Sequence, residues 1–220
     1  TGNYELNNLK LNKYTITSKI KKNIYDLSIN LDYSDDLNFE IINYKKDKGK
    51  IANITLDMNL KGNKIHLKEV SIKENNNEIF LKGLKFDKKN FVTLNKIYVK
   101  TFDEKGLQNS FEIIYSNKLR ISGKKYDAAN LNKFINKKTK TNNFKVVNKD
   151  IEINLEQILS PLSETLKNFR LIGKIKRGEF IKLSAKGDFR DDNFLDISLK
   201  QDKNTKKKQL EIYSDIPQPL

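Results

Sequence analysis

Apolar and polar residues alternate along most of this chain. The alternation is cleanest in residues 54–61, which read Ile54, Thr55, Leu56, Asp57, Met58, Asn59, Leu60 and Lys61. The same pattern recurs in residues 24–33, 91–102, 111–115, 151–155, 180–185 and 195–199. Successive side chains of a strand point to opposite faces, so the pattern predicts strands with one apolar and one polar face.

Short polar breaks separate the alternating segments, and many of them contain Gly, Asn or Asp. They are residues 33–36, 46–49, 61–64, 74–77, 87–90, 103–106, 190–193 and 202–205. These residue types accept the left-handed backbone angles of tight hairpin turns. Breaks about every ten residues predict a mainly β fold, a long antiparallel meander of roughly fifteen strands. Such a sheet can curl into an open, taco-like groove or close on its own apolar face.

Two segments depart from the alternation and predict short helices that pack on the sheet. In residues 127–136, Asp127 is a candidate N-cap for a helix that ends near Ile135. A second helix is expected within residues 155–168, starting near Pro161 with Ser160 as its cap. The apolar residues at helical spacing are Leu131, Phe134 and Ile135 in the first segment, and Ile158, Leu159, Leu162 and Leu166 in the second.

The organisation expected from this pattern has three parts. Residues 1–136 are a β-meander segment ending in a short helix, and residues 144–220 are a helix followed by a continuing meander. Residues 137–143 contain no apolar side chain, which is typical of an exposed connection. The chain starts at Thr1 without an initiator Met and ends in a Pro-containing tail directly after a strand-like segment. We therefore expect it to be a segment of a longer protein.

A net charge of +15 is compatible with attraction to nucleic acid or to an anionic membrane surface. Only four of the 43 basic residues are Arg, whose planar fork is favoured for phosphate and base recognition. The lysines are also spread along the whole chain. We therefore expect no specific nucleic-acid partner, and keep a basic nucleic-acid-binding module as a less favoured alternative.

The sequence offers little catalytic chemistry. It has no Cys and one His, His66, so cysteine nucleophiles and multi-His metal sites are excluded. Carboxylate pairs such as Asp35–Asp36 fall in predicted turns, where Asp is common for backbone reasons. Phosphate-binding glycine motifs are absent from the sequence. We expect a protein that is not an enzyme and has no catalytic residues, metal or cofactor.

The order of some elements resembles a known family. Residues 119–127 (LRISGKKYD) lead into a predicted short helix, and residues 169–175 (FRLIGKI) open a meander through 183–189 (LSAKGDF) to 210–215 (LEIYSD). This arrangement resembles the AsmA-like superfamily, which includes YhdP-like and TamB-like envelope proteins. Residues 216–219 (IPQP) depart from the pattern of the YhdP-like branch.

The resemblance implies a non-catalytic, periplasmic segment of an inner-membrane-anchored protein from a Gram-negative bacterium. Its apolar β-groove would carry phospholipid acyl chains between the inner and outer membranes, with the membrane contacts made by other parts of the parent chain. An alternative is a structural or assembly protein of the envelope that acts through protein contacts. The residues expected to line the groove are Ile54, Leu56, Met58, Leu60, Leu94, Ile97, Val99, Phe111, Ile113 and Leu183.

Overall fold

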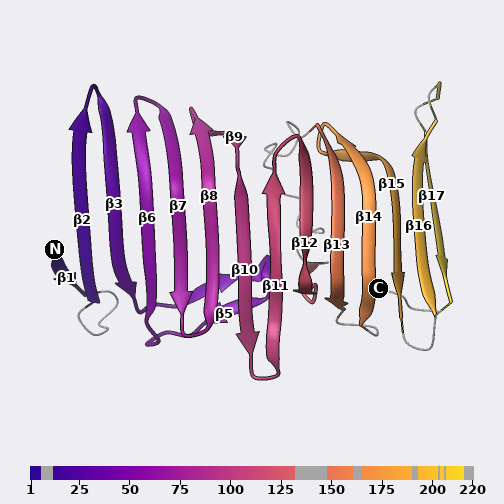
Figure 1. Cartoon of the computed structure of the whole chain (residues 1–220), viewed down its shortest axis with the longest axis horizontal. Helices are drawn as coiled ribbons and strands as arrows, with labels where there is room; N and C mark the ends of the chain where they lie inside the picture. Colours follow the sequence, from indigo (N-terminus) through magenta and orange to yellow (C-terminus); the bar gives the residue numbers. More distant parts are fainter. Residues whose placement is uncertain are drawn as a thin grey trace. The chain divides into compact units, whose positions relative to one another are not determined.

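The protein is mainly β (Figure 1). Its strands fall into two compact units, Thr1–Gln108 and Asn109–Leu220. A computed structural model describes residues 1–5, 12–131, 148–160, 165–189, 193–202, 204–205 and 207–215. Unit 1 contains β1 (Gly2–Tyr4), β2 (Asn12–Lys21), β3 (Ile24–Tyr33), β4 (Leu37–Phe39), β5 (Tyr44–Lys46), β6 (Ala52–Lys61), β7 (Lys64–Glu74), β8 (Asn77–Asp87), β9 (Asn90–Thr93) and β10 (Lys96–Asp103). The boundary falls inside β11 (Gly106–Tyr115), and unit 2 continues with β12 (Lys118–Asp127), β13 (Lys149–Leu159), β14 (Leu166–Lys176), β15 (Glu179–Asp188), β16 (Phe194–Gln201) and β17 (Lys208–Ser214).

Strand pairing confirms a mainly β fold and an open sheet. The hydrogen-bonded order follows the chain from β1 to β17, except that β9 pairs only with β8 and the β4–β5 hairpin is a separate sheet. In the described part of the chain, β1 pairs with β2 alone and β17 with β16 alone, so strand pairing does not close the sheet.

The expected antiparallel meander is wrong at one place, where β12 and β13 run parallel. A tight hairpin turn cannot join parallel neighbours, because the chain must first return to the starting end of the strand. The connection here spans residues 128–148, most of which lie outside the described residues. The sheet is therefore mixed, and the predicted exposed connection 137–143 also lies outside the described residues.

The two expected short helices are not supported, since the described residues contain no helix of seven or more residues. In the second segment, residues 155–159 belong to β13 and residues 166–168 to β14, while residues 161–164, where the helix was expected to start, lie outside the described residues. Ile158 lies opposite both Tyr126 and Leu166, so strand pairing outweighs the helical spacing of its apolar neighbours. In the first segment, Asp127 accepts a hydrogen bond from the Ala129 amide, as a cap would. The remainder of that helix, residues 132–136, lies outside the described residues.

In unit 1 the apolar residues of neighbouring strands lie directly opposite one another and form rows across the sheet. A central row and the row next to it each cross six strands. They consist of Ile16, Ile29, Leu56, Val70, Leu81 and Ile97, and of Tyr14, Leu31, Ile54, Ile72, Ile79 and Val99. Because opposite residues of paired strands share a face, these rows form one apolar face of unit 1.

A bulge keeps this face continuous where the alternation slips by one residue. Met58 of β6 lies opposite Leu67 and Asp57 opposite Glu69, so Lys68 is the extra residue of β7. Leu67 and Val70 thus share the apolar face although they are three residues apart. On the neighbouring strand, Gly83 has a φ of +71°, and a Cβ there would lie 2.4 Å from the Asn95 side chain.

Unit 2 repeats the arrangement with a row that crosses seven strands. It consists of Ile113, Ile121, Ile153, Leu171, Ala185, Ile197 and Ile212. A bulge in β12 brings Gly123 against β11, where a Cβ would lie 2.3 Å from the Ser110 carbonyl oxygen. The Phe111 ring packs edge-on against Tyr126 beside this glycine, with centroids 5.5 Å apart.

Candidate functional site: the apolar faces

The apolar face of unit 1 contains most of the predicted groove-lining residues. Ile54, Leu56, Met58 and Leu60 lie opposite apolar residues of β3 and β7, and Ile97 and Val99 continue their rows on β10. Leu94 lies between β9 and β10, where the expected continuous strand 91–102 is interrupted. The face therefore combines six of the seven predicted residues of unit 1 by register, whereas Leu94 is in a connection.

The three predicted residues of unit 2 also share a face. Phe111 lies opposite Gly123 and Ile113 opposite Ile121, while Leu183 lies opposite Gly173 and Leu199. The register of β12, β13 and β14 places these positions on the same side of the sheet. Each unit thus has its own apolar face, and whether either one holds lipid stays a prediction.

The insertion between β3 and β6 covers one end of the unit 1 face. It consists of β4, a 3-10 turn (Glu40–Ile42) and β5, and Figure 1 shows it crossing the longer strands. Tyr44 of β5 donates a hydrogen bond to Glu74 at the end of β7, and Gln108 of β11 donates to the Asn43 carbonyl. Glu74 shares the apolar face of β7 by alternation from Ile72, so the hairpin lies on the apolar face.

Burial follows the position of this hairpin. Ala52 and Val99 are 0% and 2% exposed near the covered end, where Ile42 and Tyr44 of the insertion are buried as well. Leu56, Met58 and Leu60 on the same face are only half-buried. At the β2 edge, Ile16 and Ile20 are 51% and 66% exposed. One end of the unit 1 face is therefore a packed core, and the rest remains accessible.

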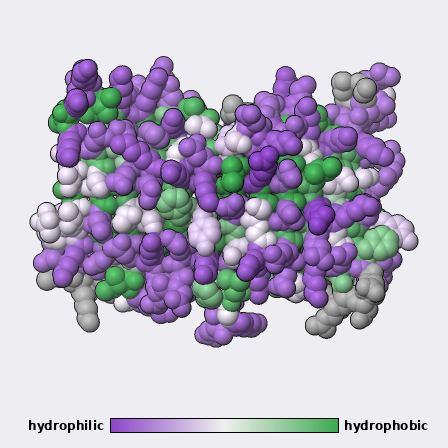
Figure 2. Space-filling model, viewed as in Figure 1, coloured by the Kyte–Doolittle hydropathy of each residue, from purple (hydrophilic) through white to green (hydrophobic). Residues whose placement is uncertain are grey.

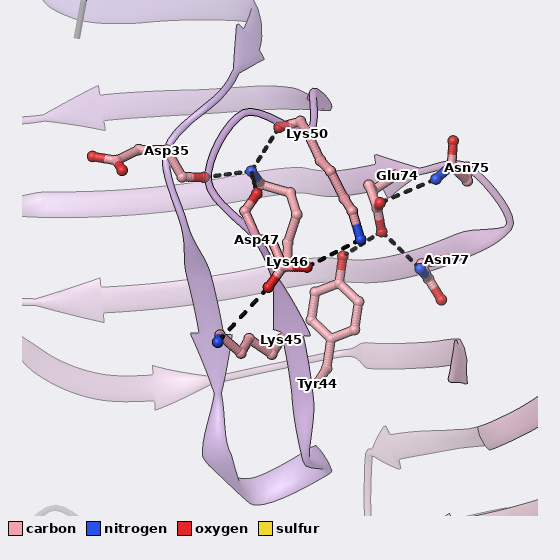
Figure 3. A network of polar contacts seen from close by, with 9 residues as sticks. All are labelled: Asp35, Tyr44, Lys45, Lys46, Asp47, Lys50, Glu74, Asn75 and Asn77. Carbon is pink, nitrogen blue, oxygen red and sulfur yellow. Dashed lines mark hydrogen bonds and ion pairs between the residues drawn. The ribbon is translucent and has the colours of Figure 1, made fainter. Parts of the chain in front are cut away.

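A buried lysine anchors the insertion (Figure 3). Lys46 is 1% exposed, and its ammonium donates to the carbonyl oxygens of Asp35, Asp47 and Lys50. Burial is the main cause that lowers the pKa of Lys46, and the nearby carboxylate of Glu74 opposes it. Three carbonyl acceptors occupy the three ammonium donors, so Lys46 is suited to holding loop backbone and not to nucleophilic chemistry.

Glu74 is the second part of this network. Its carboxylate accepts hydrogen bonds from the side chains of Tyr44, Asn75 and Asn77 at 3.2, 3.1 and 2.7 Å (Figure 3). Burial, followed by the Glu74 charge and hydrogen bond, raises the pKa of Tyr44 well above its ordinary value. The hydroxyl thus stays protonated and donates to Glu74, which joins the hairpin to the end of β7.

In unit 2 the covered end is built differently, from residues at the strand ends. Leu166, Phe189 and Leu195 form a buried cluster, against which Ile158, Phe169 and Ile197 pack. Further along the face, Ile113, Ile153 and Leu183 are half-buried. At the last strand, Leu210 and Ile212 are 55% and 57% exposed. Unit 2 therefore also has an apolar face that is packed at one end and open at the β17 edge.

The opposite face of the sheet is polar, and Figure 2 shows hydrophilic residues predominating over the surface in view. Several opposite charges pair directly across neighbouring strands, such as Lys73 with Glu78 at 3.2 Å and Lys186 with Asp196 at 3.1 Å. His66 also lies on this face, opposite Asn59 and Lys85. Burial, then the charges of Lys85 and Lys68, lowers the pKa of His66.

No protein-family model, curated protein or solved structure matches this chain. No helix of the described residues is long and apolar enough to cross a membrane. The described residues also bring together no group of three or more His, Asp or Glu side chains that could hold a metal ion.

The sequence interpretation missed the element that covers the unit 1 face. Residues 33–36 and 46–49 were expected to be separate turns, yet they flank the β4–β5 hairpin, which itself packs on the sheet. A signal existed in Phe39, Ile41, Ile42 and Tyr44, which place apolar residues densely between two turns. Their spacing does not distinguish another strand of the main sheet from a hairpin lying on its face.

Proposed function

We propose that the apolar faces of this protein bind phospholipid acyl chains, as part of a non-catalytic, AsmA-like lipid-transfer protein of the bacterial envelope. The observation that carries the proposal is the unit 1 face, where long aliphatic rows cross six strands and remain only partly buried beyond the β4–β5 hairpin. Burying a hydrocarbon chain there is favourable by about 0.8 kcal/mol per methylene. Neighbouring rows contain similar Ile, Leu and Val side chains, so an acyl chain has a similar binding energy on each row. It can therefore move from one row to the next without a chemical step.

In this proposal the sheet curves into an open groove, and Ile54, Leu56, Met58 and Leu60 line its floor in unit 1. The polar face would contact water, while phospholipid headgroups would lie at the rim of the groove. The periplasmic location, the inner-membrane anchor and the contacts with both membranes belong to the same proposal. Support for them is the resemblance of residues 119–127, 169–175, 183–189 and 210–215 to AsmA-like proteins.

The experiment that tests lipid binding uses paired photo-crosslinking positions on one strand. A photoreactive amino acid replaces Leu56 on the apolar face or Asp57 on the polar face of β6, and the protein is irradiated with phosphatidylethanolamine vesicles. We expect mass spectrometry to find lipid adducts at position 56 and not at position 57, because neighbouring side chains point to opposite faces. Equal adducts at both positions, or none at position 56, would contradict the proposal.

The same pair of positions distinguishes the rival function, an assembly protein that acts through protein contacts. The exposed residues Ile16, Ile20, Leu210 and Ile212 favour it, because such edges and faces can also pair with protein. If position 56 is crosslinked to a second protein chain in cells and never to lipid, the face is a protein-binding surface. Lipid adducts in cells would instead favour lipid transfer.

A further inference from the structure

We propose that the polar face of unit 2 contains a binding site for a small, multiply charged, phosphate-bearing anion. The site is a pocket of about 550 Å³ at one end of β14, β15 and β16. Its lining residues are Lys174, Lys176, Ile181, Lys182, Lys200, Gln201 and Asp202. The proposal does not depend on lipid binding, because these lysines lie on the face opposite the apolar rows.

The register brings like charges together in this pocket. Lys174 lies directly opposite Lys182, and Lys182 lies directly opposite Lys200. Directly opposite side chains in an antiparallel pair have Cβ atoms about 5 Å apart, and like charges at that spacing destabilise the sheet. Three adjacent strands thus present ammonium groups side by side, at a cost that a bound anion would relieve.

Elsewhere on the polar face, the rows compared with Lys174, Lys182 and Lys200 each contain an acidic residue directly opposite a lysine. Four residues further along β15, Lys186 lies opposite Asp196 on the same two strands and forms an ion pair of 3.1 Å. In unit 1, Lys82 lies opposite Lys96 but also opposite Glu69, so that row carries its own acid. None of the four pocket lysines forms an ion pair with a carboxylate in the described part of the chain.

Three carboxylates lie near these lysines, and they leave the positive charge of the pocket in excess. Glu179 is opposite Lys176, but its carboxylate forms an ion pair of 2.7 Å with Lys208. Asp150 is opposite Lys174, on the side away from Lys182. Asp202 lines the pocket, but its Oδ1 atom accepts hydrogen bonds from the amides of Asn204 and Thr205 and from the Thr205 hydroxyl. These bonds lower the pKa of Asp202 and direct its oxygen to the turn after β16. Four ammonium groups therefore surround the pocket against one lining carboxylate that is already engaged.

The geometry fits a particular class of ligand. Lysine ammonium groups act on phosphate oxygens as mobile point charges, and several of them together suit an anion with more than one phosphate group. Ile181 is the extra residue of a bulge in β15, between Phe180 and Lys182, and adds an apolar wall. An apolar wall beside convergent charged groups is typical of a small-molecule site.

The test uses inorganic tripolyphosphate as the probe and isothermal titration calorimetry of the whole chain. We expect saturable binding to one site, weakened about tenfold or more by Lys182→Gln and also by Lys200→Gln. The matched control is Lys186→Gln, which removes the same charge from the same strand and should change the affinity less than threefold. Urea unfolding without ligand should show Lys182→Gln to be as stable as the wild type or more stable, because it removes like-charge repulsion.

Two outcomes would overturn the proposal. Equal weakening by Lys182→Gln and Lys186→Gln would mean that the probe senses only the overall charge of the protein. Vesicles of phosphatidylglycerol and phosphatidylcholine supply phosphate as a lipid headgroup instead of a free anion. Binding to those vesicles without binding to tripolyphosphate would mean a membrane-contacting surface and not a small-molecule pocket.

Discussion

The apolar face of unit 1 has two regions that share the same strands but differ in what lies on them. Near the turn between β7 and β8, the β4–β5 hairpin lies on this face, and Ala52 and Val99 are almost fully buried. Toward the turn between β6 and β7, residues such as Leu60 are half-buried, and Tyr25 is 47% exposed. The same alternation thus produces a packed core in one region and an accessible apolar surface in the other.

The difference lies in the polar contacts that hold the cover in place. In the covered region, the Lys46 ammonium donates hydrogen bonds to three backbone carbonyl oxygens of the insertion. The Tyr44 hydroxyl donates to the carboxylate of Glu74 on β7. An apolar cover alone would be free to shift, whereas directional hydrogen bonds determine where it sits. The open region of this apolar face has no such network among the described residues, and it is the region to which we propose that an acyl chain binds.

The largest expected effect is the loss of the anchor in the covered region. Lys46→Met should lower the free energy of unfolding by about 3 kcal/mol, because three partly buried carbonyl oxygens lose their charged donor. Its control, Lys45→Met, changes the neighbouring exposed lysine and should stay within about 0.5 kcal/mol of the wild type. Urea denaturation followed by circular dichroism measures both. If Lys46→Met cost no more than Lys45→Met, the network would not hold the hairpin.

A smaller effect is expected when the same change, Val to Ala, is made once in each of the two regions. Val99→Ala removes two methyl groups from the covered region and should cost about 2 kcal/mol of unfolding free energy. Val70→Ala removes the same groups from the accessible central row and should cost about 1 kcal/mol, because less surface is lost from contact. The ratio of the two costs, from denaturant midpoints at equal m-values, measures how far the cover extends. Equal costs would mean that Val70 is as well packed as Val99.

High pH should weaken the covered region through Tyr44. Its raised pKa means that the folded protein holds the phenolic proton more tightly than the unfolded chain above about pH 10. This contribution to stability is therefore complete below about pH 10 and is lost as pH rises further. The lowered pKa of Lys46 acts with the opposite sign, so the difference between wild type and Tyr44→Phe isolates the tyrosine.

Tyrosine absorbance provides the measurement, since the chain has nine Tyr and no Trp. Burial raises the pKa of Tyr126 in unit 2 to about 12, so both Tyr44 and Tyr126 should ionise late in an alkaline titration. Tyr44→Phe and Tyr126→Phe should each remove one late-ionising group. If wild type and Tyr44→Phe lost the same amount of stability between about pH 10 and 12, ionisation of Tyr44 would not be a cause of the loss.

The smallest expected effect concerns the polar face, at His66. Its pKa is lowered in the folded protein, so the unfolded chain binds a proton more readily just below about pH 6.5. Stability should therefore decrease slightly as pH falls through this window, and His66→Gln should flatten that slope. As His66 is the only histidine, its NMR titration is unambiguous. A titration midpoint at or above the ordinary pKa of histidine would show that the pKa of His66 is not lowered.

Sequence patterns predicted the strands well and their partners less well. Residues 24–33 were expected to be one strand and coincide with β3, and residues 54–61 fall within β6. The predicted strand 91–102 is divided by Leu94 and Asn95, because Gly83 lets the Asn95 side chain approach β8 closely. The helix expected near Pro161 is not supported, because Ile158 belongs to β13 and pairs with both Tyr126 and Leu166.

By itself, the sequence determined that this chain forms strands with one apolar and one polar face, because side-chain direction along a strand depends only on local backbone geometry. It also determined which residues share that face between bulges, including Ile54, Leu56 and Met58. Tertiary structure alone decided that β13 runs parallel to β12, and that residues 37–46 turn back onto the sheet. Those outcomes depend on contacts between residues far apart in the chain, which no local pattern encodes.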